Sequence, residues 1–253
     1  MSGTLRIVGL GPGPTCWITP EVTQAVTAAT DLIGYEPYLA RLTTRPDQIV
    51  HGSDNRVELD RARHALALTA AGRNVVVVSG GDPGIFAMAA AVLEAVDVGD
   101  LTWRSLDIAV YPGVSAMQAA AARLGAPLGH DFCAISLSDN LKPWSLVAKR
   151  LRAAADGDFV IALYNPASKA RPDQIFEAFA ILRDVKAGVT PVAFARAVGR
   201  PDEAIIITTL AEADPALVDM STLVLIGSSE TRLISRPAAP PFVYTPRGVG
   251  GAR

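Results

Sequence analysis

The chain has 253 residues, of which 50% are hydrophobic, 6% aromatic and 19% charged, and its formal net charge is −2. This length is enough for one large or two medium domains with proper hydrophobic cores. A net charge this small excludes the basic surface by which proteins bind nucleic acid or anionic membranes, so neither is an expected partner.

Targeting and metal-binding signals are absent from the sequence. Cys16 and Cys133 are far apart, and no cysteine or histidine has metal-ligand spacing with another, so no metal site is predicted. Residues 1–10 lack the basic and apolar regions of a signal peptide, and no apolar run reaches the roughly 18 residues of a membrane span. The sequence therefore predicts a cytoplasmic protein.

The first predicted strand, residues 5–9 (LRIVG), runs into a glycine-rich loop at 9–14 (GLGPGP). A dinucleotide-binding loop needs glycine where Pro14 stands, and its helix opens at once. Here two prolines stiffen the loop, and Thr19 followed by Pro20 predicts a later helix start. The loop is therefore not typical of nicotinamide-binding proteins.

The region from 21 to 71 predicts two helices separated by short strands. Helix 21–29 is followed by strands near 32–34 and 49–51, and residues 56–71 have the spacing of an amphipathic helix. The polar side of this second helix includes Arg56 and Arg61, which favours a solvated face. The alternative is that one of these arginines faces an acidic substrate.

The stretch 74–88 (NVVVVSGGDPGIFAM) predicts a buried parallel strand, a glycine-rich turn with one carboxylate, and a helix over 85–96. Ligands of open α/β sheets bind beyond the carboxyl ends of such strands. Two interpretations of the turn stay open: a ligand loop with Asp82 at its edge, or a tight connection in which Asp82 caps the helix.

A second set of strands follows. Strand 106–110 ends at a Pro-Gly turn, and an alanine-rich helix runs on to Leu124. We place the domain boundary at this turn, with a first domain at 1–113 and a second at 114–235. In the second domain we expect a helix at 173–185 and strands at 132–136, 159–163, 191–195, 203–208 and 222–226. Residues 236–253 are rich in proline and glycine and predict a flexible tail.

Several kinds of catalytic site are not indicated. No GxSxG elbow and no GxxxxGK[ST] phosphate loop is present, which argues against a hydrolase triad and nucleotide hydrolysis. The remaining polar loops suit a site that holds a small molecule through backbone groups and positions reactants.

Three of these loops together resemble the tetrapyrrole (corrin/porphyrin) methylases. The fingerprints of that family are matched in order by residues 9–13 (GLGPG), 81–86 (GDPGIF) and 112–115 (PGVS). The resemblance covers roughly residues 4–230. It implies two α/β/α domains with a cofactor cleft between them, distinct from the Rossmann methyltransferase fold, and S-adenosyl-L-methionine as co-substrate.

Within the family, the second half is similar to the precorrin-3B carbon-17 methyltransferases of cobalamin biosynthesis. The matching stretches are 137–139 with 143–144, 163–166 with 168–169, 208–210, and 218–222 leading to 226–227. Two departures are mild: glycine at position 80 and Phe86 stand where that branch often has serine and tyrosine. The resemblance implies methylation of precorrin-3B at carbon 17 with ring contraction to precorrin-4.

The resemblance also assigns residues to the site. The implied cofactor contacts are Pro12, Gly80, Gly81, Asp82, Ile85, Ser115, Ala116, Tyr164, Asn165 and Thr222. The macrocycle is a polycarboxylate and should meet cations, so the expected substrate contacts are Ser138, Lys169, Arg171 and, as the first choice, Arg196. Further cation candidates are Arg56, Arg61 and Arg200. For the glycines the alternative is turn geometry alone.

Ring contraction requires proton movements, and Asp139 is the candidate acid or base. An Asx-turn or a helix cap before residues 142–144 is an equally good interpretation of Asp139. The family implies a homodimer that binds a small tetrapyrrole. The alternatives are another precorrin or uroporphyrinogen methylase of the same fold, more remotely a methylase acting on a modified histidine of elongation factor 2, or a non-catalytic α/β protein that binds a nucleoside or corrinoid.

Overall fold

The structure is a computed structural model, and it describes residues 3–54, 57–168, 171–248 and 250. The chain divides after Ala116 into two compact units, which we call the first and second domains. The division lies three residues after the boundary expected from the sequence. No helix in these described stretches is both long enough and apolar enough to cross a membrane.

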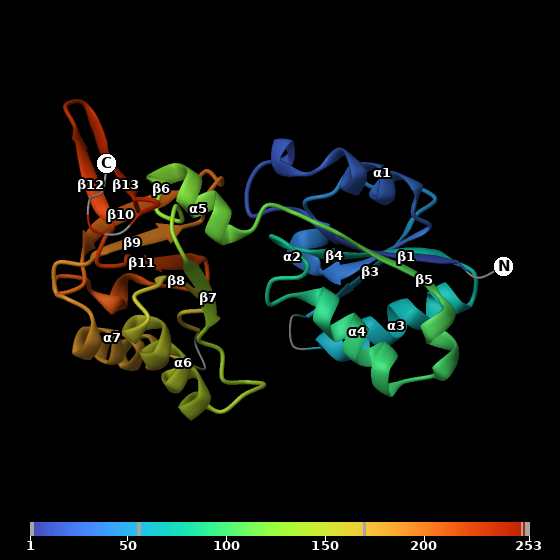
Figure 1. The fold of residues 1–253 in the computed structure, drawn as a ribbon. Helices are drawn as coiled ribbons and strands as arrows, with labels where there is room; N and C mark the ends of the chain where they lie inside the picture. Colours follow the sequence, from blue (N-terminus) through green and yellow to red (C-terminus); the bar gives the residue numbers. More distant parts are fainter. Residues whose placement is uncertain (1–2, 55–56, 169–170, 249, 251–253) are drawn as a thin grey trace. The chain divides into compact units, whose positions relative to one another are not determined.

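The first domain is a parallel sheet covered by helices on both faces (Figure 1). Its strand order is β3-β2-β4-β1-β5, and every pair is parallel. Its elements are β1 (Thr4–Gly9), α1 (Pro20–Ala28), β2 (Asp31–Tyr35), α2 (Glu36–Leu39), β3 (Ile49–Ser53), α3 (Glu58–Ala70), β4 (Asn74–Ser79), α4 (Met88–Val98) and β5 (Asp107–Tyr111), with 3-10 turns at Thr15–Trp17 and Leu101–Ser105.

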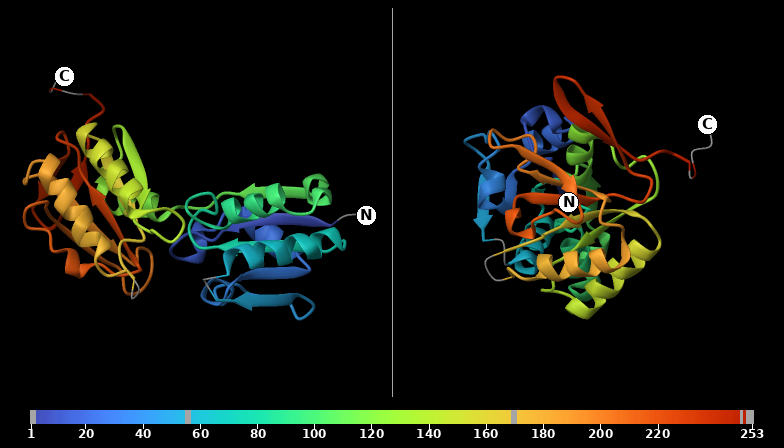
Figure 2. Two further views of the ribbon diagram at one scale, coloured as in Figure 1. Left: turned by 90° about the horizontal axis from the view of Figure 1, so that it is seen from below. Right: turned by 90° about the vertical axis from the view of Figure 1, so that its left-hand side faces the viewer.

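The valine run of β4 shows why this strand is apolar on both sides. Val75 and Val77 lie in the core formed with α3 and α4. Val76 and Val78 point to the opposite face and lie in the core formed with α1. All four side chains are buried, as the alternation of side chains along a central parallel strand requires. Figure 2 shows α3 and α4 side by side on one face of the sheet.

The second domain contains a mixed five-stranded sheet of order β10-β9-β11-β8-β7. Only β7 and β8 run parallel as neighbours, because β11 is antiparallel to both β8 and β9. Helices α6 and α7 bury one face. The elements are α5 (Ala116–Leu124), β6 (Gly125–Ala126), β7 (Phe132–Ser136), α6 (Trp144–Asp156), β8 (Val160–Tyr164), α7 (Gln174–Val185), β9 (Pro191–Arg196), β10 (Ala204–Thr209), a 3-10 turn Pro215–Leu217, β11 (Thr222–Ile226), β12 (Arg232–Arg236) and β13 (Ala239–Tyr244).

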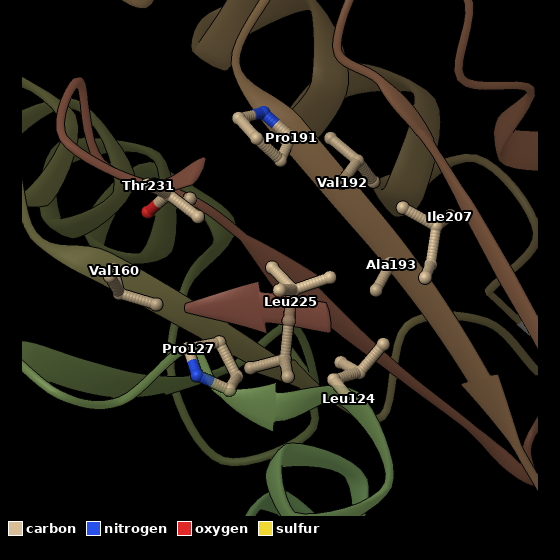
Figure 3. A pocket seen from close by; sticks show the side chains of 11 residues that line it. Leu124, Pro127, Val160, Pro191, Val192, Ala193, Ile207, Leu225 and Thr231 are labelled. Atoms are coloured by element: carbon tan, nitrogen blue, oxygen red, sulfur yellow. The ribbon is translucent and has the colours of Figure 1, made fainter. Parts of the chain in front are cut away.

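The opposite face of this sheet is covered by the end of α5 and by a small three-stranded sheet, β12-β13-β6. Figure 3 shows the apolar pocket at this contact, where Leu124 and Pro127 lie against Val160, Ala193 and Leu225. The pocket contains no residue of the expected site. It belongs to the core that holds the small sheet in place.

The expectation of a flexible tail from residue 236 is wrong for residues 239–245. Strand β13 pairs with β12 and, through Val243, with Gly125 of β6. Val243 and Thr245 are buried, and the Thr245 hydroxyl donates a hydrogen bond of 2.7 Å to the carbonyl of Pro127. Prolines at 240 and 241 hid this strand in the sequence, since proline is rare in strands other than at edges and ends.

Candidate functional site

In the first domain, three loops meet at the carboxyl edge of the sheet. They follow the neighbouring strands β4, β1 and β5, which end side by side because they are parallel. The backbone N–H of Leu10 donates to the carbonyl of Ser79 at 3.0 Å, and that of Gly11 donates to the carbonyl of Gly81 at 3.1 Å. The GLGPG and GDPGIF motifs therefore form one backbone-bonded unit.

Glycines permit the close contact of these loops. A Cβ atom on Gly9 would lie 2.5 Å from the carbonyl oxygen of Gly81, and one on Gly113 would lie 2.4 Å from the same atom. Gly80 packs against the ring of Tyr38, where a Cβ would lie 2.7 Å from ring carbon Cζ. Contact with neighbouring backbone explains the requirement for glycine at Gly9 and Gly113, and contact with the Tyr38 ring explains it at Gly80.

Gly81 differs from these glycines. Its φ of +67° favours glycine, but a Cβ there would meet nothing closer than 4.0 Å. Gly81 is half-buried, and its main chain leaves room for a Cβ-sized group without a clash, which fits a ligand that approaches the main chain closely. This is the position where the family would place S-adenosylmethionine, and the residues present fit that group.

Asp82 ties the second loop to the third. One carboxylate oxygen, Oδ1, accepts the N–H of Gly84 at 2.8 Å, and the other, Oδ2, accepts the N–H of Gly113 at 3.0 Å. The alternative interpretation of Asp82 as the cap of the following helix is excluded, since α4 begins only at Met88, whose N–H is bonded to the hydroxyl of Ser79 at 3.3 Å. Residues 83–87 continue the loop, with Phe86 at a φ of +51°.

Sequence reasoning missed Arg41. Its guanidinium donates to three carbonyls of the first loop: Gly11 at 2.8 Å, Gly13 at 2.8 Å and Leu10 at 3.0 Å. These contacts fix the loop from outside the motif. A side chain that donates to backbone carbonyls has no characteristic sequence motif. The one available signal was general: the carbonyls of a loop that contains prolines need hydrogen-bond donors from elsewhere in the chain.

The other cofactor candidates of this domain lie in the same loops. Pro12 is half-buried in the first loop, Ile85 is half-buried in the second, and Ser115 is buried just before Ala116, where α5 begins. The structure thus brings together all seven first-domain candidates: Pro12, Gly80, Gly81, Asp82, Ile85, Ser115 and Ala116.

In the second domain, the ends of β7, β8 and β9 share one edge of the sheet. Ser136 pairs with Tyr164, and Arg196 at the end of β9 pairs with Thr222 at the start of β11. The Tyr164 hydroxyl accepts the N–H of Met117 in the first turn of α5 at 3.0 Å. The candidates from four separate motifs are therefore neighbours along this edge.

Asn165 and Thr222 have local partners. Asn165 has a φ of +51°, and its amide donates to the hydroxyl of Ser136 at 3.0 Å. The Thr222 hydroxyl donates to Oδ1 of Asp219 at 2.8 Å, and the side chain is buried. The structure gives both side chains a role in holding their turns.

Asp139 does not cap a helix, because the N-cap residue of α6 is Pro143. Its Oδ2 accepts the side-chain amide of Gln174 at 3.0 Å, and Nε of Arg171 lies 3.8 Å from its Oδ1. The buried amide oxygen of Gln174 has no hydrogen-bond partner among the residues that the structure describes. Asp139 is therefore held in the loop after β7 by side chains from beyond β8.

Two expected substrate cations are engaged within their own domain. Arg171 is 11% exposed and donates to the carbonyls of Leu137 at 3.4 Å and Asn165 at 3.5 Å. Arg196 bonds Asp219 at 2.8 Å and Asp202 at 2.9 Å, and these two carboxylates raise the pKa of Arg196. This arrangement does not support Arg196 as the first choice for a substrate carboxylate.

The remaining candidates divide similarly. Ser138 is half-buried next to Asp139, and its carbonyl accepts the ammonium of Lys142 at 2.8 Å. Arg61 is 4% exposed and bonds the hydroxyl of Ser53 at 2.9 Å, so it belongs to the core side of α3. Lys169 and Arg56 lie outside the described residues.

Comparison with known proteins identifies the family. The family model of the Tetrapyrrole (Corrin/Porphyrin) Methylases matches residues 4–214. A protein of Sinorhizobium sp named Precorrin-3B C(17)-methyltransferase is 60% identical over 252 residues, which cover 100% of this chain and 99% of that protein. A probable cobalt-factor III C(17)-methyltransferase of Salmonella typhimurium is 40% identical over 246 residues, 96% of this chain and 98% of that protein.

The fold agrees with a solved structure. The crystal structure of the methyltransferase CobJ matches with a TM-score of 0.92 and 52% identity, and the match covers 97% of this chain and 100% of that one. The prediction of two α/β domains and the family resemblance read from three loops are confirmed. The chain belongs to the tetrapyrrole (corrin/porphyrin) methylases.

Proposed function

We propose that this protein transfers a methyl group from S-adenosyl-L-methionine to carbon 17 of precorrin-3B and contracts the ring to give precorrin-4. The observation that carries the proposal is the 60% identity to a protein of that name along the full length of both chains. The three joined loops of the first domain support it, since their main chain at Gly81 leaves room for a close-fitting group.

The first-domain loops are the proposed cofactor site. Gly81 leaves space for the ligand, and the carboxylate of Asp82 joins the second loop to the third. The other proposed contacts in these loops are Pro12, Ile85, Ser115 and Ala116. In the second domain we retain Tyr164, Asn165 and Thr222 as proposed cofactor contacts. Bound there, S-adenosylmethionine supplies an electrophilic sulfonium methyl group. The task of the chain is then to orient the reactants and exclude water.

No strongly basic side chain is needed for the methylation, because a reduced tetrapyrrole carbon is itself nucleophilic. The contraction needs an acid or base, and Asp139 keeps this proposed role. Its hydrogen bond from Gln174 fixes the direction of one carboxylate oxygen, as positioning of an acid–base group requires. Ser138 and Arg171 in the adjoining loops, together with Lys169, remain proposed substrate contacts.

The test is incubation of the purified protein with S-adenosylmethionine and precorrin-3B. We expect one equivalent of S-adenosylhomocysteine, a substrate mass gain of one methyl group and the shifted absorption of a contracted ring. Cofactor binding without turnover across tetrapyrrole substrates would instead indicate a binding protein.

A second candidate is the same reaction on a cobalt-containing macrocycle, which the 40% identity to a probable cobalt-factor III C(17)-methyltransferase favours. Parallel assays with the cobalt-containing and metal-free substrates separate the two, since the preferred one has the higher kcat/KM. We also propose a cytoplasmic homodimer, on the family resemblance alone. Light scattering of the purified protein tests the dimer.

A further inference from the structure

The loop between β7 and α6 carries positive charge that the described residues around it neutralise only in part. Lys142 lies in this loop, and Arg171 contacts the loop from beyond β8 through the carbonyl of Leu137 at 3.4 Å. The charges of Arg150 on α6 and of Arg171 disfavour the charged form of Lys142. The carboxylate of Asp139, in the same loop, offsets part of this repulsion. Three cations and one carboxylate leave this group of side chains, which we call the Lys142 cluster, with a net charge of +2.

Lys142 itself has hydrogen-bonding capacity to spare. Its ammonium has three donors, and one of them is bonded to the carbonyl of Ser138 at 2.8 Å. Within the described part of the chain, no carboxylate lies within ion-pairing distance of Lys142 or Arg150, and Asp139 is already held by Gln174 and Arg171. Partial burial, together with the repulsion of Arg150 and Arg171, lowers the pKa of Lys142.

The start of α6 adds to the positive potential. This helix of 13 residues begins at Trp144, two positions after Lys142, with no side-chain cap and no acidic residue in its first turn. The N-terminus of a helix carries a partial positive charge and favours an anion. A half-buried lysine, Arg171 and this helix end thus lie at one loop, and the charge of Arg150 on α6 adds to the positive potential there.

We propose that the Lys142 cluster binds a carboxylate side chain of the tetrapyrrole, with the ammonium of Lys142 as the direct contact. The proposal rests on the proposed function for the identity of the macrocycle. Lys142 takes the role that was first expected for Arg196, whose guanidinium already pairs with Asp219 and Asp202.

A carboxylate at this site has two sources, the tetrapyrrole and the amino-acid end of S-adenosylmethionine. Charge decides between them. The methyl donor carries a sulfonium, an ammonium and one carboxylate and is a cation overall, so a cluster of net positive charge repels it. The tetrapyrrole is a polyanion and is attracted by the same cluster.

The test compares three variants with the wild type: Lys142→Met, Lys142→Arg and, as a control, Lys149→Met, which removes an exposed lysine from α6. One arm measures KM for precorrin-3B, and a second measures binding of uroporphyrin III, a stable polycarboxylate, by its fluorescence. We expect Lys142→Met to weaken both by roughly thirtyfold, the usual size for a hydrogen bond to a charged group. Lys142→Arg and Lys149→Met should remain near wild type.

S-adenosylhomocysteine binding, measured by calorimetry, should be unchanged in all variants. A pH series adds a readout that a purely structural lysine would not move. Because Lys142 must be charged to bind, wild-type affinity for uroporphyrin III should fall as the pH rises through its lowered pKa. The Lys142→Arg variant should keep its affinity over the same range, since arginine stays protonated.

Unchanged KM and uroporphyrin binding in Lys142→Met would overturn the inference while leaving the proposed function intact. A selective loss of S-adenosylhomocysteine binding would also overturn it, since the carboxylate would then be that of the cofactor. A wild-type protein without turnover of precorrin-3B would contradict the proposed function, and the uroporphyrin arm would still decide whether Lys142 binds a tetrapyrrole carboxylate.

Discussion

The carboxyl edges of the two sheets are built by different means. In the first domain, backbone meets backbone: Gly9, Gly81 and Gly113 bring three loops into contact, and Asp82 bonds main-chain N–H groups. In the second domain, side chain meets side chain, as in Arg196 with Asp219 and Asp139 with Gln174. A backbone-built site is rigid and tolerates little change, whereas one built from side chains can exchange partners. The first arrangement suits an invariant cofactor and the second a polyanionic substrate.

The largest effect is expected from Gly113→Ala. The new Cβ would lie 2.4 Å from the carbonyl oxygen of Gly81 and 2.8 Å from that of Gly9, and backbone atoms cannot move aside singly. We expect the free energy of unfolding to fall by about 3 kcal/mol, as in overpacked cores, and S-adenosylhomocysteine binding to be lost. Urea unfolding and calorimetry measure the two effects.

Gly248→Ala is the matched control, since a Cβ at that position would meet nothing within 4 Å. A Gly113→Ala protein with wild-type stability and cofactor affinity would show that the three loops are not packed through their backbone. The proposed difference between the two domains would then be wrong.

Asp82→Asn should have the next largest effect. One of the two carboxylate oxygens is replaced by an NH2 group, which cannot accept the N–H of Gly84 or Gly113. Loss of a charge-assisted hydrogen bond costs about 2 kcal/mol, so we expect S-adenosylhomocysteine affinity to fall roughly thirtyfold. Tetrapyrrole binding should change little.

Asp100→Asn is the control for this substitution. Asp100 makes a similar contact, with its Oδ1 accepting the N–H of Thr102 at 2.8 Å, but it lies in the turn before β5. Its replacement should leave cofactor affinity at the wild-type level. If both variants bind S-adenosylhomocysteine as the wild type does, the placement of the cofactor at the Asp82 loop is wrong.

Arg41→Met tests whether the first loop depends on support from outside its motif. Three carbonyls at Leu10, Gly11 and Gly13 would lose their donor. We expect cofactor affinity to fall by roughly tenfold, which corresponds to the loss of one or two hydrogen bonds of ordinary strength. Arg41→Lys should recover only part of it, because one ammonium cannot reproduce the planar fork.

Hydrogen exchange of the Gly9–Pro14 loop should accelerate in Arg41→Met. Arg63→Met on the exposed side of α3 should leave this exchange unchanged. Faster exchange without any loss of cofactor affinity would separate the first loop from the cofactor site.

Arg196→Ala should have the smallest effect, and on stability more than on binding. The pKa of Asp219 is lowered because hydrogen bonds from Thr222, Arg196 and Ser221 outweigh the opposing effect of burial. A carboxyl with a lowered pKa contributes stability above its unfolded pKa of about 4 and loses it as the pH falls through the folded value. The variant should therefore melt below the wild type at neutral pH, and the two melting temperatures should converge in acid.

A difference in melting temperature that does not shrink in acid would show that Arg196 acts through something other than its carboxylate partners. A selective loss of tetrapyrrole binding with unchanged stability would return Arg196 to the substrate site. It would then compete with Lys142 for the role proposed above.

The contrast between the domains also explains what the sequence could predict. The loops that meet in the first domain could be recognised in the sequence because glycines packed backbone to backbone, as at Gly9 and Gly113, appear as fixed motifs. The valine run of β4 likewise predicts a strand covered on both faces. The carboxylate partners of Arg196 were not predicted, because Asp219 and Asp202 come close to it only through the pairing of β9 with β10 and β11. Arg41 was not predicted either, because its acceptors are backbone carbonyls of a distant loop.

Strand β13 was missed for a related reason. Its segment contains two adjacent prolines and becomes a strand only because β12 and β6 pair with it and the hydroxyls of Thr231 and Thr245 bond at 2.9 Å beneath it. Tertiary contacts of this kind leave no local pattern in the sequence.

The most direct test of the central claim follows the methyl group itself. Precorrin-3B is incubated with the protein and S-adenosylmethionine labelled with carbon-13 in its methyl group, and the product is examined by NMR. We expect a single labelled methyl group, bonded to carbon 17 of a contracted macrocycle. A label on another carbon, or none on the macrocycle, would contradict the proposed function.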